Sequence, residues 1–575
     1  YFINFSDGQP YYGNNEIRYQ GTEAENHTRK MVNNMRNIGI SVLSYFIGGS
    51  YDDEYENKSF TRMYGDDASF INATNMMQVA KTMNKKFLSN YDNLGKIKSI
   101  TIIESPDIKP IGVGEGTTPT IPKFMDQIGL DVDKFNPTYK YGINYQGWYD
   151  NNNFNDKELS TNNWFHPFEP LDINPNDNGI IKFFNDLKTK GLMTPFKDLF
   201  WSKYLMDMND EGEDDLIDEW RKYMKFSDGG FAPPIESTNK FFKYDYKPLD
   251  KTHNPLPYHG YHFDIEDFVG ALKDYCIKLN VVDYISDTVV GYNSNKDGSI
   301  KNVVLSEGNE ISGDIFIDAS GFNSVLFKNI YNEPFVDYSK YLPCNRAVSF
   351  DVDGKTRKHT YTTARAMSNG WSWKIPSGNK TGYGYVYNGD LIDEDKAIDE
   401  LSKVTGHTIK DINTLSYNSG TYKRTWIKNC YAIGLSAGFY EPLEATSHMI
   451  TYLQVTRLEG LISRLNNNTQ KRPISELIDH HNDFMFNAFE SLRNYLIPHY
   501  VLSNRKGDFW EYFNDLKLED RTQSLLDDWK KNVNSFQLNL GKQFNTFHMW
   551  SWVYMMTGYD NLPNGVRVNK KTGEK

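Results

Sequence analysis

Apolar residues along the chain follow two periods, one typical of strands and one typical of helices. Short apolar runs at 2–6, 40–47 and 98–104 predict strands, and apolar positions near helical spacing at 23–39 and 72–88 predict helices. Strands and helices that alternate in this order predict an α/β fold.

The pattern continues beyond residue 260. A helix is expected at 265–279, then strands at 288–292 and 300–305 joined by Asn-Lys-Asp-Gly turn residues, and a further strand at 313–318. Runs at 361–362, 370–376 and 382–387 predict an antiparallel sheet. The stretch 429–434 predicts a strand that leads into a helix at 448–465, and the tail at 474–557 is predicted to be helical.

Composition and charge narrow the class of protein. The chain has 575 residues and a formal net charge of −12, which argues against nucleic acid as a main partner. No run of about eighteen apolar residues predicts a membrane span, and no signal peptide is recognisable. Three widely spaced cysteines indicate a reducing, cytoplasmic compartment. The bias toward Phe, Tyr, Asn, Ile and Lys is compatible with an AT-rich viral or marine source.

The segment Gly370-Trp-Ser-Trp-Lys-Ile-Pro376 is the most distinctive motif of the chain. Trp371 and Trp373 are two residues apart and face the same side of an extended segment, and Pro376 is expected to end the ladder. On the residues alone this is an edge strand with an aromatic face. The segment also resembles the signature of the flavin-dependent tryptophan halogenases, in which it forms the wall between the flavin and a distant substrate.

A second motif begins at Glu104, which closes a predicted strand and is followed by a glycine-containing loop as far as Pro119. An acid at a strand end can accept hydrogen bonds from a ribose, and glycines let the backbone approach a pyrophosphate. The string resembles the flavin-strap loop of the halogenases. The Gly-x-Gly-x-x-Gly loop with which that family opens is missing from residues 1–95, which indicates either a fusion that replaced the first βα unit or an artefact of sequence assembly.

Two further segments carry candidate catalytic chemistry. Lys140, on a predicted strand, would ordinarily be a solvated residue, but its surroundings resemble the catalytic lysine strand of the halogenases. The segment Trp164 to Phe168 resembles the substrate lid of that family, where His166 and Phe168 would stack on an indole ring. The simpler interpretation of His166 is a histidine in a surface loop.

The run Phe439-Tyr-Glu-Pro-Leu-Glu444-Ala-Thr446-Ser447 stands between a predicted strand and a predicted helix. Helix N-terminal amides at this point suit a flavin ring or a halide ion. The run resembles the halogenase active site, so the resemblance implies that Glu444 is the catalytic glutamate. It also implies that Thr446 and Ser447 contact the halide, although the family usually has glycine at the second position. Without the resemblance, Glu444 is an acid that complements the helix dipole.

The same resemblance implies a full set of site residues and no metal. The FAD-binding residues would be Glu104, Val113, Gly114, Glu115, Gly116, Thr117, Thr118, Asp318, Gly321, Gly434 and Leu435. The residues along the substrate pocket and tunnel would be His166, Phe168, Trp371, Trp373, Tyr500 and Trp510.

Residues 1–90 have a resemblance of their own. Ser6-Asp7-Gly8 follows a predicted strand, and the later helix and apolar strand resemble the second half of a von Willebrand A-type domain. In that family the Asp lies at a metal site, but the earlier Asp-x-Ser-x-Ser loop is absent here. We therefore interpret Asp7 as a turn residue.

Together these motifs predict three parts and one reaction. The parts are a partial α/β segment at 1–90, an FAD-binding Rossmann-like domain of the glutathione-reductase type with an antiparallel sheet at 91–465, and a mostly α-helical substrate module at 466–575. The resemblance implies that reduced FAD from a separate flavin reductase, oxygen and a halide give hypohalous acid. This acid would reach Lys140 through a tunnel and halogenate an electron-rich aromatic substrate. A homo-oligomer is compatible with the sequence.

Two alternatives stay open at this point. One is a flavin-dependent monooxygenase or oxidase of the same fold that uses no halide. The other is an inactive fusion that acts as a binding protein, which the missing phosphate loop favours. Lys140 and Glu444 occurring together argue against the first, because hydroxylation needs neither.

Overall fold

The computed structural model describes most of the chain after residue 99 and short segments before it. The described residues are 2–6, 12–13, 18–19, 26, 28–34, 42–48, 68–72, 99–149 except 109, 111 and 113, 163–168, 259–279, 282–354, 361–377, 380–409, 411–466, 473–559, 561 and 563–564. The chain forms two compact units, one of Tyr1–Gly95 with Trp220–Leu256 and one of Lys96–Glu219 with Pro257–Lys575.

The first unit contains a small parallel sheet. Its strands are β1 (Phe2–Ser6), β4 (Val42–Gly48) and β5 (Ala68–Asn72), with β4 in the centre. A short antiparallel pair, β2 (Tyr12–Gly13) and β3 (Arg18–Tyr19), lies between β1 and β4 in sequence. Helical residues 28–34 precede β4, which agrees with the predicted strand–helix–strand order. Asp7 and most of the helix expected at 72–88 lie outside the described residues.

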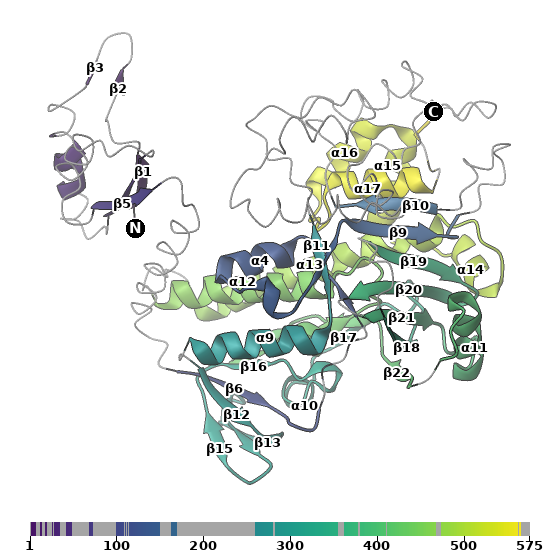
Figure 1. Ribbon diagram of the computed structural model, residues 1–575, viewed down its shortest axis with the longest axis horizontal. Coiled ribbons are helices and arrows are strands. Elements are labelled where there is room, and N and C mark those ends of the chain that lie inside the picture. Colours follow the sequence, from purple (N-terminus) through teal and green to yellow (C-terminus); the bar gives the residue numbers. More distant parts are fainter. Residues whose placement is uncertain are drawn as a thin grey trace. The chain divides into compact units, whose positions relative to one another are not determined.

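The second unit is built around a seven-stranded mixed sheet. The strands, in spatial order, are β10 (Asn163–Pro167), β9 (Gly142–Gln146), β19 (Thr362–Met367), β20 (Gly370–Ser377), β21 (Lys380–Tyr387), β18 (Arg346–Asp353) and β22 (Asn413–Ser416). All neighbours are antiparallel except β9 and β19. Figure 1 shows this sheet with helix α11 (Glu394–Thr405) beside β18 and β21.

The structure corrects two expectations about the Trp371 motif. β20 is the central strand of the sheet and not an edge strand, because β19 and β21 pair with its two sides. Pro376 does not end the ladder, since it lies opposite Thr381 and the pairing continues to Ser377. Trp371 and Trp373 therefore lie in a strand that is hydrogen-bonded to another strand along both of its edges.

Smaller sheets complete the second unit. One parallel pair joins β6 (Ile100–Glu104) to β12 (Val282–Ser286), and another joins β16 (Phe316–Asp318) to β25 (Cys430–Ala432), which also pairs with β24 (Trp426–Ile427). The remaining sheets are β7 (Glu115–Gly116), β11 (Gly260–Phe263) and β8 (Thr138–Lys140); β13 (Val289–Ser294), β14 (Ile300–Leu305) and β15 (Glu310–Ser312); and β17 (Phe335–Asp337), β23 (Gly420–Tyr422) and β26 (Gly438–Phe439).

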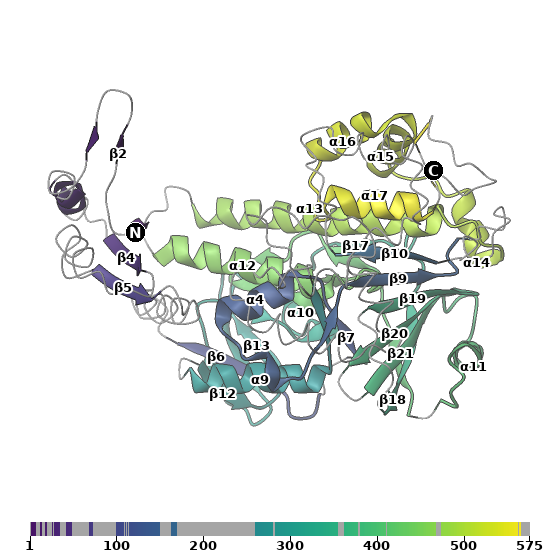
Figure 2. The ribbon, with the colours of Figure 1, turned by 45° about the horizontal axis from the view of Figure 1, so that its top comes forward.

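Helices connect these sheets and form the C-terminal module. Near the small sheets lie α4 (Thr120–Ile128), α9 (Ile265–Lys278) and α10 (Phe327–Ile330), with short turns η2 (Val132–Lys134), η5 (Gly321–Asn323) and η6 (Gly434–Ser436). The tail consists of α12 (Ser447–Asn466), α13 (Ile474–Val501), α14 (Asp508–Glu511), η7 (Tyr512–Asn514), α15 (Asp520–Lys531), α16 (Val533–Lys542) and α17 (Met549–Gly558). In Figure 2, α17 lies alongside α13, and β10 runs beneath them.

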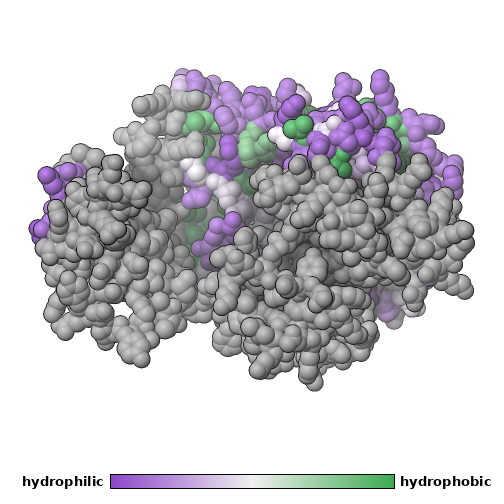
Figure 3. Space-filling view, turned by 90° about the horizontal axis from the view of Figure 1, so that it is seen from above, coloured by the Kyte–Doolittle hydropathy of each residue, from purple (hydrophilic) through white to green (hydrophobic). Residues whose placement is uncertain are grey.

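One large apolar core joins the main sheet to the helical tail. It includes Tyr145 and Trp371 from the sheet and Leu492, Trp552 and Met556 from α13 and α17. These helices bury apolar side chains on the sheet, which is the interaction that stabilises such layers. The surface in Figure 3 is mostly hydrophilic where residues are described, with hydrophobic residues scattered between. The predicted α/β fold with a helical tail is confirmed.

The cysteines and the long helices were also compared with the expectations from sequence. Cys344 and Cys430 are buried and Cys276 is partly buried, and none of the three forms a disulfide. None of the helices in the described part of the chain is long and apolar enough to cross a bilayer.

Candidate active site

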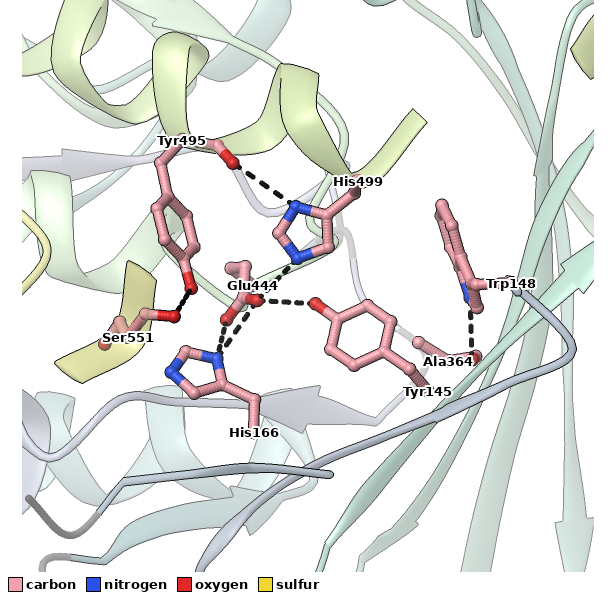
Figure 4. A network of polar contacts seen from close by, with 8 residues as sticks. All are labelled: Tyr145, Trp148, His166, Ala364, Glu444, Tyr495, His499 and Ser551. Atoms are coloured by element: carbon pink, nitrogen blue, oxygen red, sulfur yellow. Dashed lines mark hydrogen bonds and ion pairs between the residues drawn. The ribbon is translucent and has the colours of Figure 1, made fainter. Parts of the chain in front are cut away.

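The carboxylate of Glu444 lies at the centre of a buried polar network (Figure 4). Oε1 accepts a hydrogen bond from the Tyr145 hydroxyl at 2.5 Å and lies 3.1 Å from Nε2 of His499. Nδ1 of His166 lies 2.9 Å from Oε2. All four side chains are almost inaccessible to solvent. A carboxylate with three such partners is held in one orientation.

Distant parts of the chain supply these partners. Tyr145 comes from β9, His166 from the neighbouring strand β10, and His499 from the last turns of α13. Glu444 stands in the loop between β26 and α12. Ala445 has a φ of 54°, a left-handed conformation that is uncommon for alanine and that turns the chain into α12.

His499 contacts both the backbone of its own helix and the carboxylate of Glu444. Its Nδ1 lies 3.2 Å from the carbonyl oxygen of Tyr495. Its Nε2 faces a carboxylate oxygen of Glu444 at 3.1 Å. Burial alone raises the pKa of Glu444, but the charges and hydrogen bonds of His166 and His499 hold it well below its ordinary value.

Lys140 is fully buried, and its Nζ has no hydrogen-bond partner among the described residues. Burial lowers the pKa of Lys140 to about 7, although the nearby charges of Glu444 and Glu115 act in the opposite direction. Each of these carboxylates is held by histidine, Glu115 by His448 at 3.2 Å. The amine is therefore near two carboxylates but forms no ion pair with either in the part of the chain that the structure describes, and near pH 7 much of it is neutral.

The surroundings of His166 are aromatic. Its ring centroid lies 6.0 to 6.4 Å from the rings of Phe168, Tyr495, Phe547 and Tyr554. The Phe168 ring is also 5.2 Å from Nζ of Lys140. The lid segment predicted from sequence is thus an edge strand of the main sheet whose side chains are largely buried, and His166 is not a surface-loop histidine.

The two tryptophans of β20 differ in their environment. Trp371 is buried in the main core, and Trp373 is partly buried beside it, with ring centroids 6.1 Å apart. Gly384 on β21 makes room for the second ring, since a Cβ there would lie 2.1 Å from Cζ2 of Trp373. The wall predicted from the motif therefore depends on a glycine of the next strand.

Tyr500 and Trp510 take part in core packing. The Tyr500 hydroxyl donates to Oε1 of Glu441 at 2.5 Å, and Nε1 of Trp510 donates to the carbonyl of Met367 at 2.8 Å. Burial raises the pKa of Glu441 to about 7, although the Tyr500 hydrogen bond opposes this. Neither ring contacts the Glu444 carboxylate, so their assignment to the substrate pocket stays a prediction.

The ends of the parallel strands fit a flavin. β16 and β25 run into Gly321 and Gly434, whose φ values are 73° and 56°. A Cβ added at Gly321 would meet nothing within 4 Å, so the backbone is open to a ligand there. Ligands of open α/β sheets bind at the carboxyl ends of parallel strands. Leu435 lies in the turn η6 between Gly434 and Ser436.

The other predicted flavin residues are placed as follows. Glu104 ends β6, where its Oε2 accepts from Lys273 at 2.9 Å and from the Tyr284 hydroxyl. Asp318 accepts from backbone amides of Ser320, Leu326 and Phe327, so it orders the loop after β16. The strap loop contains Gly114, Glu115, Gly116, Thr117 and Thr118, of which the last three are buried. Val113 lies outside the described residues.

Thr446 and Ser447 lie at the start of α12. The carbonyl of Thr446 accepts the first hydrogen bond of the helix, from the amide of Ile450. Ser447 is the first helical residue, so the free amides of this turn and the helix dipole favour an anion. Thr446, two residues after Glu444, is fully buried.

Several residues of the site were missed by sequence reasoning. Tyr145, His499 and Glu441 contact the predicted residues directly, and His262 lies near Lys140. The pairing of a histidine on α13 with a glutamate 55 residues earlier leaves no local signal in the sequence. Tyr145 occupies the same alternating strand segment as Lys140 and was the one residue that this pattern could have suggested.

Comparison with known proteins places the chain in a family. The sequence profile of the family described as tryptophan halogenase matches residues 86–212 and 226–572. Tryptophan 7-halogenase KtzQ of Kutzneria sp. is 30% identical over 439 residues, 74% of this chain and 75% of that protein. Tryptophan 6-halogenase ThaL of Streptomyces albogriseolus is 26% identical, over 76% of this chain and 77% of that protein.

Solved structures share the fold. A flavin-dependent halogenase from Xanthomonas campestris has a TM-score of 0.65 at 22% identity, with 84% of this chain and 87% of that chain covered. The halogenase Tar14 of taromycin biosynthesis has a TM-score of 0.66 at 23% identity, with 86% and 90% covered. The matching family model and the curated relatives define a flavin-dependent oxidoreductase. The chain belongs to the tryptophan halogenase family.

Proposed function

We propose that the protein is an FAD-dependent halogenase that acts on an electron-rich aromatic substrate such as tryptophan or another indole. The observation that supports this best is the buried amine of Lys140, which has no hydrogen-bond partner among the residues that the structure describes, together with the buried carboxylate of Glu444. The names of KtzQ and ThaL, both tryptophan halogenases, support the substrate class.

FAD would be held by Gly321, Gly434 and Leu435 at the strand ends, by the strap loop Gly114–Thr118 and by Glu104. When bound and reduced, FAD would supply, together with oxygen, the oxidising chemistry that converts halide to hypohalous acid. We assign its reduction to a separate flavin reductase. The first amides of α12, with Thr446 and Ser447, would hold the halide, since a helix N-terminus favours an anion.

Lys140 and Glu444 would divide the halogen transfer between them. The neutral Lys140 amine receives the halogen, because its lone pair is available near pH 7. Glu444 is better suited to stabilising the cationic ring intermediate than to removing its proton. A general base works best with a pKa near the working pH, and the pKa of Glu444 lies well below its ordinary value.

Trp371 and Trp373 would separate the flavin from the organic substrate, and His166 and Phe168 would line the substrate side. Tyr500 and Trp510 would act on that side indirectly, through packing. This arrangement favours halogenation over direct oxygenation, because it keeps the flavin apart from the ring to be modified.

Other assignments also remain proposals. The sequence predicts a division into 1–90, 91–465 and 466–575 and a von Willebrand A-like character for the first segment. It also predicts a homo-oligomer, a cytoplasmic location and a viral source. The net charge of −12 supports the expectation that nucleic acid is not a partner.

The test is an assay of the purified protein with FAD, a flavin reductase, NADH, tryptophan and either chloride or bromide. We expect a product that contains one halogen, identified by its isotope pattern in mass spectrometry, and none from the Lys140→Ala variant, which should still quench FAD fluorescence. An oxygenated product that forms equally without halide would replace this function with that of a monooxygenase.

A further inference from the structure

His262 is a buried histidine that lies close to Lys140 and makes one polar contact within the described part of the chain. It occupies β11, the middle strand of its sheet, opposite Gly116 of β7 and Thr138 of β8. Its Nε2 lies 2.8 Å from Oγ1 of Thr362, the first residue of β19. Its Nδ1 is buried and has no hydrogen-bond partner among the described residues.

These contacts determine where the ring carries its proton. Burial lowers the pKa of His262 well below its ordinary value, and the charge of Lys140 adds to this, so the ring is neutral and has one N–H. On Nδ1 that N–H would be a buried donor without a partner, which proteins tolerate less well than an unpaired acceptor. On Nε2 it donates to Oγ1 of Thr362. The hydroxyl hydrogen of Thr362 is then free to donate to another group.

Gly116 brings that hydroxyl and the Lys140 amine to one place. A Cβ added at Gly116 would lie 3.2 Å from Nζ of Lys140, 3.3 Å from Oγ1 of Thr362 and 3.5 Å from Cδ2 of His262. Because glycine has no side chain, nothing from residue 116 separates the amine from the hydroxyl. The hydroxyl of Thr362, a hydrogen-bond donor, and the neutral amine of Lys140 therefore both lie next to the space beside Gly116.

We propose that Thr362 donates a hydrogen bond to the oxygen of hypohalous acid at Lys140, and that His262 is the positioning residue that aims this hydroxyl. The inference rests on the proposed function, which supplies the hypohalous acid. It adds two residues to the halogen-transfer site that neither the motifs nor the Glu444 network contain.

The step is balanced with the groups present. The lone pair of Nζ forms the nitrogen–halogen bond, and the electron pair of the oxygen–halogen bond leaves with the oxygen. The hydrogen bond from Thr362 stabilises the negative charge that develops on this oxygen. The proton released from the Lys140 nitrogen ends on the same oxygen, so the products are a haloamine and water.

The experiment compares the amount of bromine transferred to tryptophan with the amount that leaves the protein as free hypobromous acid. The full-length protein is assayed with FAD, reductase, bromide and tryptophan in the presence of monochlorodimedone, which traps free hypobromous acid. For Thr362→Val we expect the ratio of trapped to transferred bromine to rise about three- to tenfold, the worth of one hydrogen bond. Thr362→Ser keeps the hydroxyl and should restore the ratio, while Thr421→Val, which removes a buried hydroxyl in another sheet, is the control.

His262 is tested in the same assay. His262→Leu removes the donor to Thr362 and should raise the ratio, whereas His262→Gln keeps an N–H and should return it toward that of the unsubstituted protein. In flavin-free protein treated with hypobromous acid, mass spectrometry should find less bromine on Lys140 in Thr362→Val than in Thr362→Ser.

The outcomes separate the two proposals. If the unsubstituted protein brominates neither tryptophan nor the trap, the proposed function fails. If it brominates tryptophan and the ratio is the same in Thr362→Val, Thr362→Ser and His262→Leu, only the role of Thr362 and His262 is overturned.

Discussion

Nε2 of His499 lies 3.1 Å from Oε1 of Glu444, while its Nδ1 lies 3.2 Å from the carbonyl oxygen of Tyr495 one helical turn earlier. The histidine is therefore locked to the backbone of α13 and to the active-site carboxylate at the same time. If Glu444 takes part in halogen transfer as proposed, the reaction depends on a helix of the C-terminal tail, because α13 helps to keep Glu444 ionised and oriented.

Replacing His499 with Gln tests this relationship. The amide can still donate one hydrogen bond, but it carries no charge, so the pKa of Glu444 should rise and its carboxylate should be less firmly held. We expect a loss of about three- to tenfold in the rate of product formation at neutral pH, with a larger loss at lower pH. Equal losses across the pH range would contradict an electrostatic role.

Glu444→Gln keeps the size of the side chain and removes its negative charge. If Glu444 stabilises a cationic ring intermediate, product formation should fall about 100-fold or more, a loss typical of removing one electrostatic stabiliser. Product formation is measured by liquid chromatography, and escaped hypohalous acid is measured in parallel. Glu307→Gln, in an exposed turn, is the matched control. A loss below threefold would remove Glu444 from the catalytic role.

The sequence predicted the elements better than it predicted how the site is assembled. Hydrophobic periodicity located β20, α9 and the helical tail, since burial on one face imposes a regular pattern. It placed β20 at an edge, because a proline is unusual in an inner strand. Nothing local encodes that Tyr145, His166 and His499 converge on one carboxylate, because β9, β10 and α13 meet only after the chain has folded.

Lys140→Met is expected to stabilise the folded protein while it abolishes halogenation. The amine is buried without a hydrogen bond among the described residues, and methionine fills the same space without a polar atom. The pKa of Lys140 is about 7 in the folded protein against 10.5 for an ordinary lysine. Between these values the unfolded chain binds more protons, so the stability of the unsubstituted protein rises with pH there.

The gain in melting temperature from Lys140→Met should therefore be largest below about pH 7 and should shrink as the pH rises toward 10.5. Calorimetry at several pH values measures it. Lys296→Met, at an exposed turn position, should give no such pH-dependent gain. A destabilised Lys140→Met variant would indicate that Lys140 has partners in the folded protein.

Halogen transfer itself should depend on pH through the same amine. Only the neutral amine has a lone pair for the halogen, so the ratio of product to escaped hypohalous acid should rise with pH through about 7 and then level off. Glu441 is a second buried group, whose pKa is raised to about 7, and its hydrogen bond to Tyr500 is independent of Lys140. Glu441→Gln should therefore keep the midpoint of this profile. If the rise near pH 7 disappears in Glu441→Gln, the group that titrates is Glu441 and not Lys140.

Gly384→Ala should disturb the tryptophan wall through a single methyl group. The new Cβ would lie 2.1 Å from the ring of Trp373, and both residues are in paired strands that have little room to move. Overpacking of this kind costs about 1 to 3 kcal/mol, so the melting temperature should fall and tryptophan fluorescence should change as Trp373 is displaced. Gly291→Ala, on β13, is the matched control, because a Cβ there meets nothing within 4 Å. If Gly384→Ala is as stable as the control and its fluorescence is unchanged, Trp373 does not depend on this glycine for its position.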